Sequence, residues 1–153
     1  MKLLEISDIF HRQNPLHPWH VDCEITKKCD NKCVHCYLQK MSVPQDVPIE
    51  IIKRTIEKLK AIGVFEIGYT GGEPFLCKGF DYVLQFTKDT GITSAIYTSG
   101  NNITKQRAKL IRESAVLRAE VTFLGANEQM HNRLTNNRNA YQQLLRSVCS
   151  CSR

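Results

Sequence analysis

Short β-like runs alternate with amphipathic helical segments after the first twenty residues, and this alternation constrains the fold more than any other feature. The predicted strands are residues 21–26, 64–69, 92–98 and 117–123. Apolar residues at helical spacing predict helices at residues 49–62, 80–90, 105–113 and 141–148. Strands and helices that alternate in this way form βαβ units, so we expect an α/β protein with a parallel sheet.

The predicted sheet has an unpartnered last strand. Four βα units neither close a barrel nor make a balanced doubly wound sheet, because nothing pairs with the outer side of residues 117–123. We divide the chain into an N-terminal extension (1–20), a folded core (21–148) and a short tail (149–153). The core is therefore expected to be an incomplete, apparently truncated barrel.

Composition narrows the class of protein. A chain of 153 residues is about the size of one domain. The N-terminus has no apolar segment of the kind found in a signal peptide, and no run reaches the roughly 20 apolar residues of a membrane span. We therefore predict a cytoplasmic protein without membrane contact. The net charge of +6 is spread over several segments without interleaved aromatic residues, which disfavours a nucleic-acid partner.

A cysteine triplet directly follows the first predicted strand. Cys29, Cys33 and Cys36 have C-x₃-C-x₂-C spacing, and such clusters in a reducing compartment are more often metal ligands than disulfides. Structural zinc takes four ligands, so a zinc site would need Cys23 or His35 as well. An iron–sulfur cluster held by three thiolates would instead leave one iron open to a small molecule. Both possibilities remain open on spacing alone.

Other chemically unusual residues also follow predicted strands. The turn Thr70-Gly71-Gly72-Glu73-Pro74 follows the second strand, Thr98-Ser99-Gly100 follows the third, and Thr122 lies near the end of the fourth. The carboxyl ends of the strands in a barrel-like parallel sheet lie on one face, where function gathers. We therefore expect these residues to surround one site together with the cysteines.

The cysteine spacing, followed one βα unit later by Gly71-Gly72-Glu73-Pro74, resembles the radical S-adenosylmethionine (radical SAM) superfamily. The resemblance implies a partial (βα) barrel in which Cys29, Cys33 and Cys36 bind a [4Fe–4S] cluster. The amino and carboxylate groups of SAM would chelate the fourth iron. The carbonyls of Gly71 and Gly72, with the Glu73 carboxylate, would accept hydrogen bonds from the SAM amino group.

Further site residues are implied by the same resemblance. His35 and Tyr37 would lie near the adenine, and Ser99 replaces the usual Asn of a T-N-G turn. Thr122 would contact the ribose, in a position where the family more often has Ser. Residues 121–126 and 131–135 resemble the subgroup that modifies peptides and proteins, often with a SPASM domain, although Asn132 replaces the usual Asp.

The function implied is reductive cleavage of SAM to a 5′-deoxyadenosyl radical, which modifies a peptide or protein. Such an enzyme needs a reductant such as flavodoxin or ferredoxin, and no catalytic residue beyond the cluster ligands is predicted. Two alternatives remain: a non-catalytic zinc-binding domain, and an incomplete iron–sulfur fragment that turns over nothing. The resemblance covers residues 21–148 but lacks the last strands of the family's core.

Overall fold

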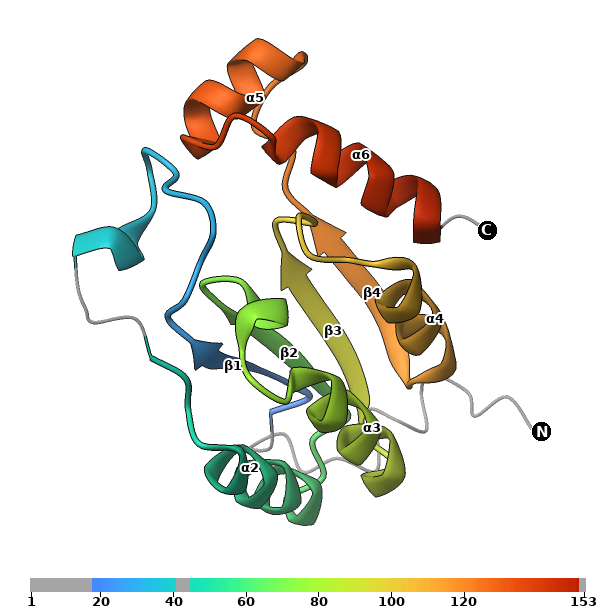
Figure 1. Ribbon diagram of the computed structural model, residues 1–153. Coiled ribbons are helices and arrows are strands. Elements are labelled where there is room, and N and C mark those ends of the chain that lie inside the picture. Colours follow the sequence, from blue (N-terminus) through green and yellow to red (C-terminus); the bar gives the residue numbers. More distant parts are fainter. Residues whose placement is uncertain (1–17, 41–44, 152–153) are drawn as a thin grey trace.

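A parallel sheet forms the centre of the protein. The structure is a computed structural model that describes residues 18–40 and 45–151 (Figure 1). The strands are β1 (His20–Thr26), β2 (Glu66–Gly71), β3 (Thr93–Thr98) and β4 (Val116–Val121), paired in that order and all parallel. This arrangement confirms the predicted α/β fold with a parallel sheet.

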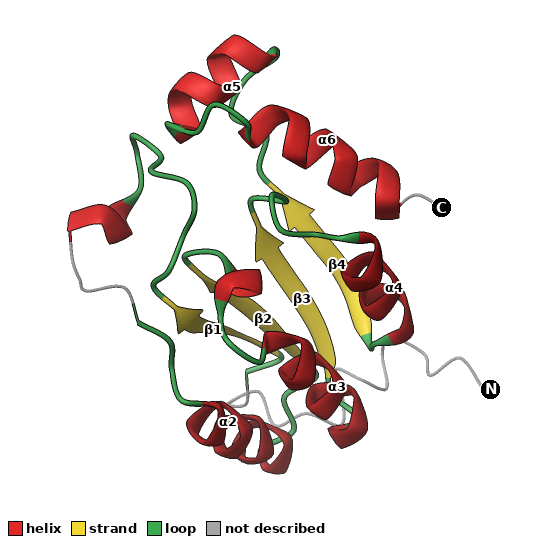
Figure 2. Ribbon diagram, viewed as in Figure 1, coloured by secondary structure: helices red, strands yellow, loops and turns green. Residues whose placement is uncertain are grey.

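Three helices cover one face of the sheet, as Figures 1 and 2 show. They are α2 (Ile49–Ala61), α3 (Phe80–Thr90) and α4 (Lys105–Glu113), each connecting two neighbouring strands. Their apolar sides pack on inward-facing strand residues such as Ile67, Tyr69 and Ile96, which are fully buried. Burial of this apolar surface is the main favourable contribution to folding.

Local signals explain why the helices begin and end where they do. Pro48 directly precedes α2, and the Thr104 side chain accepts a hydrogen bond from the Arg107 N–H to cap α4. Gly91 ends α3 in the left-handed conformation, at φ +81°. These signals could be read in the sequence, and the predicted boundaries lie within about two residues of the observed ones.

Two helices follow β4 and lie across the end of the sheet where β3 and β4 finish (Figure 1). They are α5 (Glu128–Thr135) and α6 (Ala140–Cys151). The sequence did not predict α5. The helix predicted around residues 141–148 is present, and it continues to Cys151 into the residues assigned to the tail. Buried Leu144 anchors α6 beside Gly100, whose carbonyl accepts a hydrogen bond from the Ser147 hydroxyl.

The sheet face turned away from α2, α3 and α4 carries charged side chains. Buried Glu66 is hydrogen-bonded to His20 at 2.6 Å and forms an ion pair with Arg118 at 3.0 Å. Arg118 also binds Glu120 at 2.9 Å, toward the end of β4. The outer edge of β4 has no strand beside it among the described residues, and Leu117 there is 59% exposed. Within the same residues, no helix has the length and apolarity needed to span a membrane.

Candidate functional site

A cavity of about 400 Å³ lies at the carboxyl ends of the strands. It brings together residues from the loop after β1 to α5 that are more than 100 positions apart in the sequence. The residues predicted for the site that line this cavity are Cys29, Cys33, His35, Cys36, Tyr37, Gly71, Gly72, Ser99 and Thr122. Of the predicted site residues, only Glu73 lies outside this lining, fully buried beneath it.

The cysteine loop (residues 29–36) is held in place by the segment that the sequence analysis missed. The N–H groups of Lys32 and Val34 donate to the carbonyls of Thr135 and Leu134 at the end of α5, at 2.9 and 3.0 Å. The buried Asn31 side chain accepts hydrogen bonds from Asn101 and Asn137, both at 2.8 Å. The loop is therefore positioned from two sides, by the turn after β3 and by the α5–α6 connection.

Two thiols of the cysteine loop, those of Cys29 and Cys33, have raised pKa values. Desolvation of its sulfur raises the pKa of Cys29 to about 11, and the N–H of Asn31 partly opposes this rise. Desolvation also raises the pKa of Cys33. Cys29 and Cys33 are therefore protonated at neutral pH, and binding of a metal centre would displace their protons.

The turn after β2 approaches the cysteine loop closely because it contains two glycines. A Cβ on Gly71 would lie 2.2 Å from the Thr26 carbonyl oxygen, and a Cβ on Gly72 would lie 2.1 Å from that of Lys28. Gly71 also has φ +129°, which other residues rarely adopt. The N–H groups of Gly72 and Glu73 donate to these two carbonyls, at 2.8 and 2.7 Å. The glycines thus fix the distance between turn and loop.

We expect a Gly72→Ala variant to lose iron after anaerobic reconstitution, because the new methyl group would push residues 27–29 away from the turn. Such overpacking costs about 1–3 kcal/mol of folding free energy. A matched control is Gly63→Ala, where the positive φ makes Ala costly by about 1–2 kcal/mol but no atom lies within 4 Å. Equal iron content in both variants, measured beside their urea unfolding curves, would contradict this role of Gly72.

Glu73 joins two strand ends from beneath the cavity. Its carboxylate accepts hydrogen bonds from the Thr98 hydroxyl at 2.8 Å, from the Ser99 N–H at 2.8 Å and from the Ser99 hydroxyl at 2.6 Å. The Phe75 N–H donates to it at 3.2 Å. Burial raises the pKa of Glu73, and the hydrogen bonds from Ser99 and Thr98 oppose the rise. Glu73 therefore has a positioning role, which the sequence prediction did not include.

The same contacts show what Ser99 does. Its hydroxyl and its amide both bind one oxygen of Glu73, so the residue that replaces the usual Asn closes the link between the two turns.

At the opposite side of the cavity, Tyr37 is 59% exposed. Its hydroxyl donates a hydrogen bond to Glu24 on β1, which helps to raise the pKa of Tyr37 to about 12. Tyr37 and His35 thus lie at the solvent-exposed rim of the cavity.

The remaining wall comes from β4 and α5. Thr122 lies just after β4, one residue beyond its last paired position, and lines the cavity beside Leu124 and His131. His131 is 1% exposed and was quoted in the sequence analysis only as part of a motif. The sequence signal that could have predicted α5 is its N-cap residue, Asn127. Its side chain accepts a hydrogen bond from the Met130 N–H at 2.9 Å.

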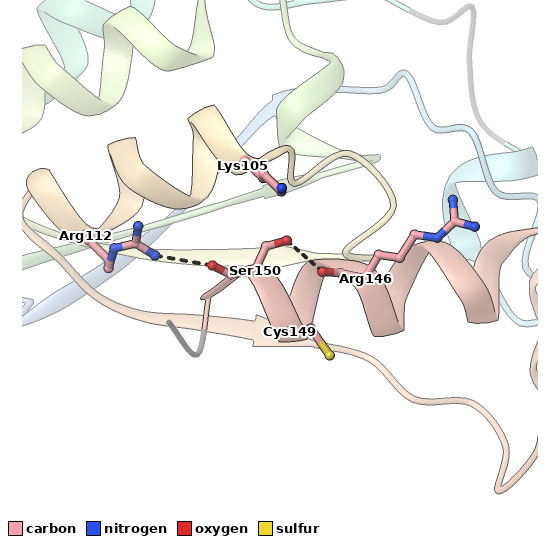
Figure 3. A pocket seen from close by; sticks show the side chains of 5 residues that line it. All are labelled: Lys105, Arg112, Arg146, Cys149 and Ser150. Carbon is pink, nitrogen blue, oxygen red and sulfur yellow. Dashed lines mark hydrogen bonds between the residues drawn. The ribbon is translucent and has the colours of Figure 1, made fainter.

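A second, larger cavity of about 600 Å³ lies between α4 and α6, away from these residues (Figure 3). Its lining residues are Lys105, Arg112, Arg146, Cys149 and Ser150. Arg112 donates to the Ser150 carbonyl at 3.3 Å, and Ser150 donates to the Arg146 carbonyl at 2.8 Å. None of the predicted site residues lies there, and Cys149 is separate from the cysteine triplet.

Comparison with known proteins decides the family. The model of the radical SAM superfamily matches residues 23–151, which is most of the chain. The chain belongs to the radical SAM superfamily. Radical SAM proteins bind a [4Fe–4S] cluster and SAM, and the homologues matched by this chain are enzymes. The cysteine triplet and the Gly-Gly-Glu-Pro turn were therefore correct signals of the family.

Two curated relatives of this radical SAM chain have different products. Fe-coproporphyrin III synthase of Methanosarcina barkeri is 26% identical over 141 residues, which are 91% of this chain and 34% of that protein. PqqA peptide cyclase of Bradyrhizobium diazoefficiens is 25% identical over 130 residues, which are 84% of this chain and 34% of the cyclase. The chain thus spans about a third of the length of the curated relatives it matches.

Solved structures show the same fold. SuiB of Streptococcus suis bound to S-adenosylmethionine superimposes with a TM-score of 0.74 at 19% identity, covering 89% of this chain and 32% of SuiB. SuiB bound to its precursor peptide SuiA gives a TM-score of 0.71 at 21% identity, covering 82% of this chain and 28% of SuiB. The four-stranded sheet is therefore part of a radical SAM (βα) barrel, as predicted.

Proposed function

We propose that this chain is the cluster-binding and SAM-binding part of a radical SAM enzyme that modifies a peptide or protein. Cys29, Cys33 and Cys36 hold the [4Fe–4S] cluster, and SAM occupies the 400 Å³ cavity beside it. The observation that carries the proposal is that the three thiols and the Gly71-Gly72 turn line the same cavity. The cysteine triplet alone could be a zinc site, and the two glycines alone could be an ordinary turn. Their position around one cavity supports a common function.

The donor set fits a cluster better than a single zinc ion. Among residues 18–40 and 45–151, no three His, Cys, Asp or Glu side chains converge on a point where they could bind one metal ion. A tetrahedral zinc site would require such convergence, with Cys23 or His35 as the fourth ligand beside the three thiols. The thiolates of an iron–sulfur cluster each bind a different iron, so they need only surround a common volume. The predicted zinc alternative is therefore disfavoured.

The protein's own residues bind and orient SAM in this proposal. A [4Fe–4S] cluster held by Cys29, Cys33 and Cys36 would supply the electron for reductive cleavage of SAM to methionine and a 5′-deoxyadenosyl radical. The backbone of Gly71 and Gly72 accepts hydrogen bonds from the amino group, while Glu73 and Ser99 link that turn to the end of β3. Thr122 binds the ribose, and His35 and Tyr37 border the adenine at the rim.

The substrate class is supported by two relatives. One is a peptide cyclase, and one neighbouring structure holds a precursor peptide. The resemblance of residues 121–126 and 131–135 to the peptide-modifying subgroup points the same way. A reductant such as flavodoxin or ferredoxin would supply the electron, because none of the residues proposed for the site is itself an electron donor.

The test is anaerobic purification and reconstitution, followed by electron paramagnetic resonance (EPR) of the reduced protein with and without SAM. A spectrum that changes on addition of SAM is the expected result, and 5′-deoxyadenosine formed with dithionite would then be measured by liquid chromatography. Bound zinc without sulfide would overturn the proposal. A cluster whose spectrum ignores SAM would instead assign the chain to the incomplete fragment that the sequence analysis considered.

A further inference from the structure

His131 is a buried polar residue in the cavity wall that the proposed function does not use. It lies on α5, is 1% exposed and lines the cavity together with Thr122 and Leu124. Its ring packs against Phe123 and Tyr141, with centroids 6.0 and 5.8 Å apart. Because the residue is almost fully buried, each nitrogen of the imidazole needs a partner from the protein or from a ligand.

The hydrogen bonds of His131 define its tautomer. Nδ1 accepts a hydrogen bond from the Leu124 N–H at 3.2 Å, so the proton of the neutral ring is on Nε2. Burial lowers the pKa of His131, which keeps the ring neutral near pH 7. Within the part of the chain that the structure describes, Nε2 has no hydrogen-bond partner. A single N–H donor thus remains available on a residue that lines the cavity.

The position of Thr122 indicates which half of SAM would meet this donor, an argument that rests on the proposed function. Thr122, which the proposed function places at the ribose, follows β4 and lines the cavity together with His131. The adenosine half of SAM would therefore be the half that meets His131. Adenine ring nitrogens and ribose oxygens are hydrogen-bond acceptors, whereas a neutral imidazole Nε2–H is a donor.

We propose that His131 is a SAM-binding residue whose Nε2–H donates a hydrogen bond to the adenosine half of SAM. The bond from the Leu124 N–H holds the ring in the tautomer that this contact needs. Residues 124–131 thereby form a specific part of the nucleoside pocket in addition to closing the cavity. The donor also favours a nucleoside over an apolar occupant at this wall, because only an acceptor satisfies it.

Two substitutions separate ligand binding from a structural role. In His131→Asn the side-chain oxygen can still accept from the Leu124 N–H, but the donor at the Nε2 position is lost. In His131→Gln the side-chain amide reaches the Nε2 position, but the acceptor at the Nδ1 position is lost. The probe is SAM itself, titrated into the reconstituted full chain under anaerobic conditions, with the dissociation constant taken from calorimetry and from the change in the EPR spectrum.

We expect His131→Asn to weaken SAM binding about tenfold while its urea unfolding midpoint stays near that of the wild type. His131→Gln should keep SAM affinity within about threefold and should lose stability instead. The reverse pattern, or equal SAM affinity in all three proteins, would overturn the proposal and leave His131 a packing residue.

The same experiment distinguishes this failure from failure of the proposed function. Iron content and the response of the wild-type EPR spectrum to SAM test the proposed function without reference to His131. If the wild type binds a cluster and responds to SAM while His131→Asn behaves identically, only the role of His131 is refuted. If the wild type does not respond to SAM, both proposals fail together.

Discussion

A Cys33→Ala variant is expected to retain little iron after anaerobic reconstitution, compared with about four irons per chain in the wild type. Cys33 is the central thiol of the triplet and lines the cavity with Cys29 and Cys36. Losing one of three protein thiolates leaves two irons without a protein ligand, because SAM can occupy only one. Iron and acid-labile sulfide per chain, with the reduced EPR spectrum, provide the measurement.

The matched control for this variant is Cys149→Ala. Cys149 is exposed on α6 and lies at the other cavity, between α4 and α6. Its loss should leave iron and sulfide unchanged. If both variants kept their iron, or both lost it to the same degree, the assignment of the cluster to the triplet would be wrong.

A Glu73→Ala variant is expected to lose about 3 kcal/mol of folding free energy. The substitution removes the acceptor of hydrogen bonds from Thr98, Ser99 and Phe75 and leaves their donors unpaired in a buried place. It also disconnects the glycine turn from the end of β3, so SAM affinity should fall with stability. Urea unfolding with the linear extrapolation gives the change in free energy.

Glu113→Ala serves as the control for charge and helix propensity. Glu113 is exposed at the end of α4 and pairs with Lys109 at 3.7 Å, so its loss should cost less than about 0.5 kcal/mol. A Glu73→Ala protein as stable as the control would contradict the positioning role. Retained stability with lost SAM binding would instead indicate that Glu73 contacts SAM directly, as the family resemblance implied.

The order of elements from β1 to α4 could be predicted because each boundary carries its own local signal. Pro48, Gly91 and Thr104 mark helix ends, and the inward positions of β2 and β3 are apolar. The residues around the cavity could also be predicted, since parallel strands present their carboxyl ends at one face. These inferences need only neighbouring residues and one rule of topology.

The elements that were missed depend on contacts between distant segments. Helix α5 has few apolar residues, and it is stabilised in part by its backbone bonds to Lys32 and Val34 in the cysteine loop. Asn31 has no local signal at all, because its partners Asn101 and Asn137 come from other parts of the chain. The burial of the Glu73 carboxylate likewise depends on where β3 places Thr98 and Ser99.

The attachment of the cysteine loop to α5 sets the order in which the site can form. Asn31 and Asn137 are 106 positions apart, and the loop's backbone partners Leu134 and Thr135 are similarly distant. Contacts between residues so far apart in the sequence form late in folding, because closing a long loop costs conformational entropy before its hydrogen bonds can form. During synthesis the three cysteines leave the ribosome long before α5 exists. We therefore expect the metal to enter after translation has passed residue 137, into a domain that is already assembled.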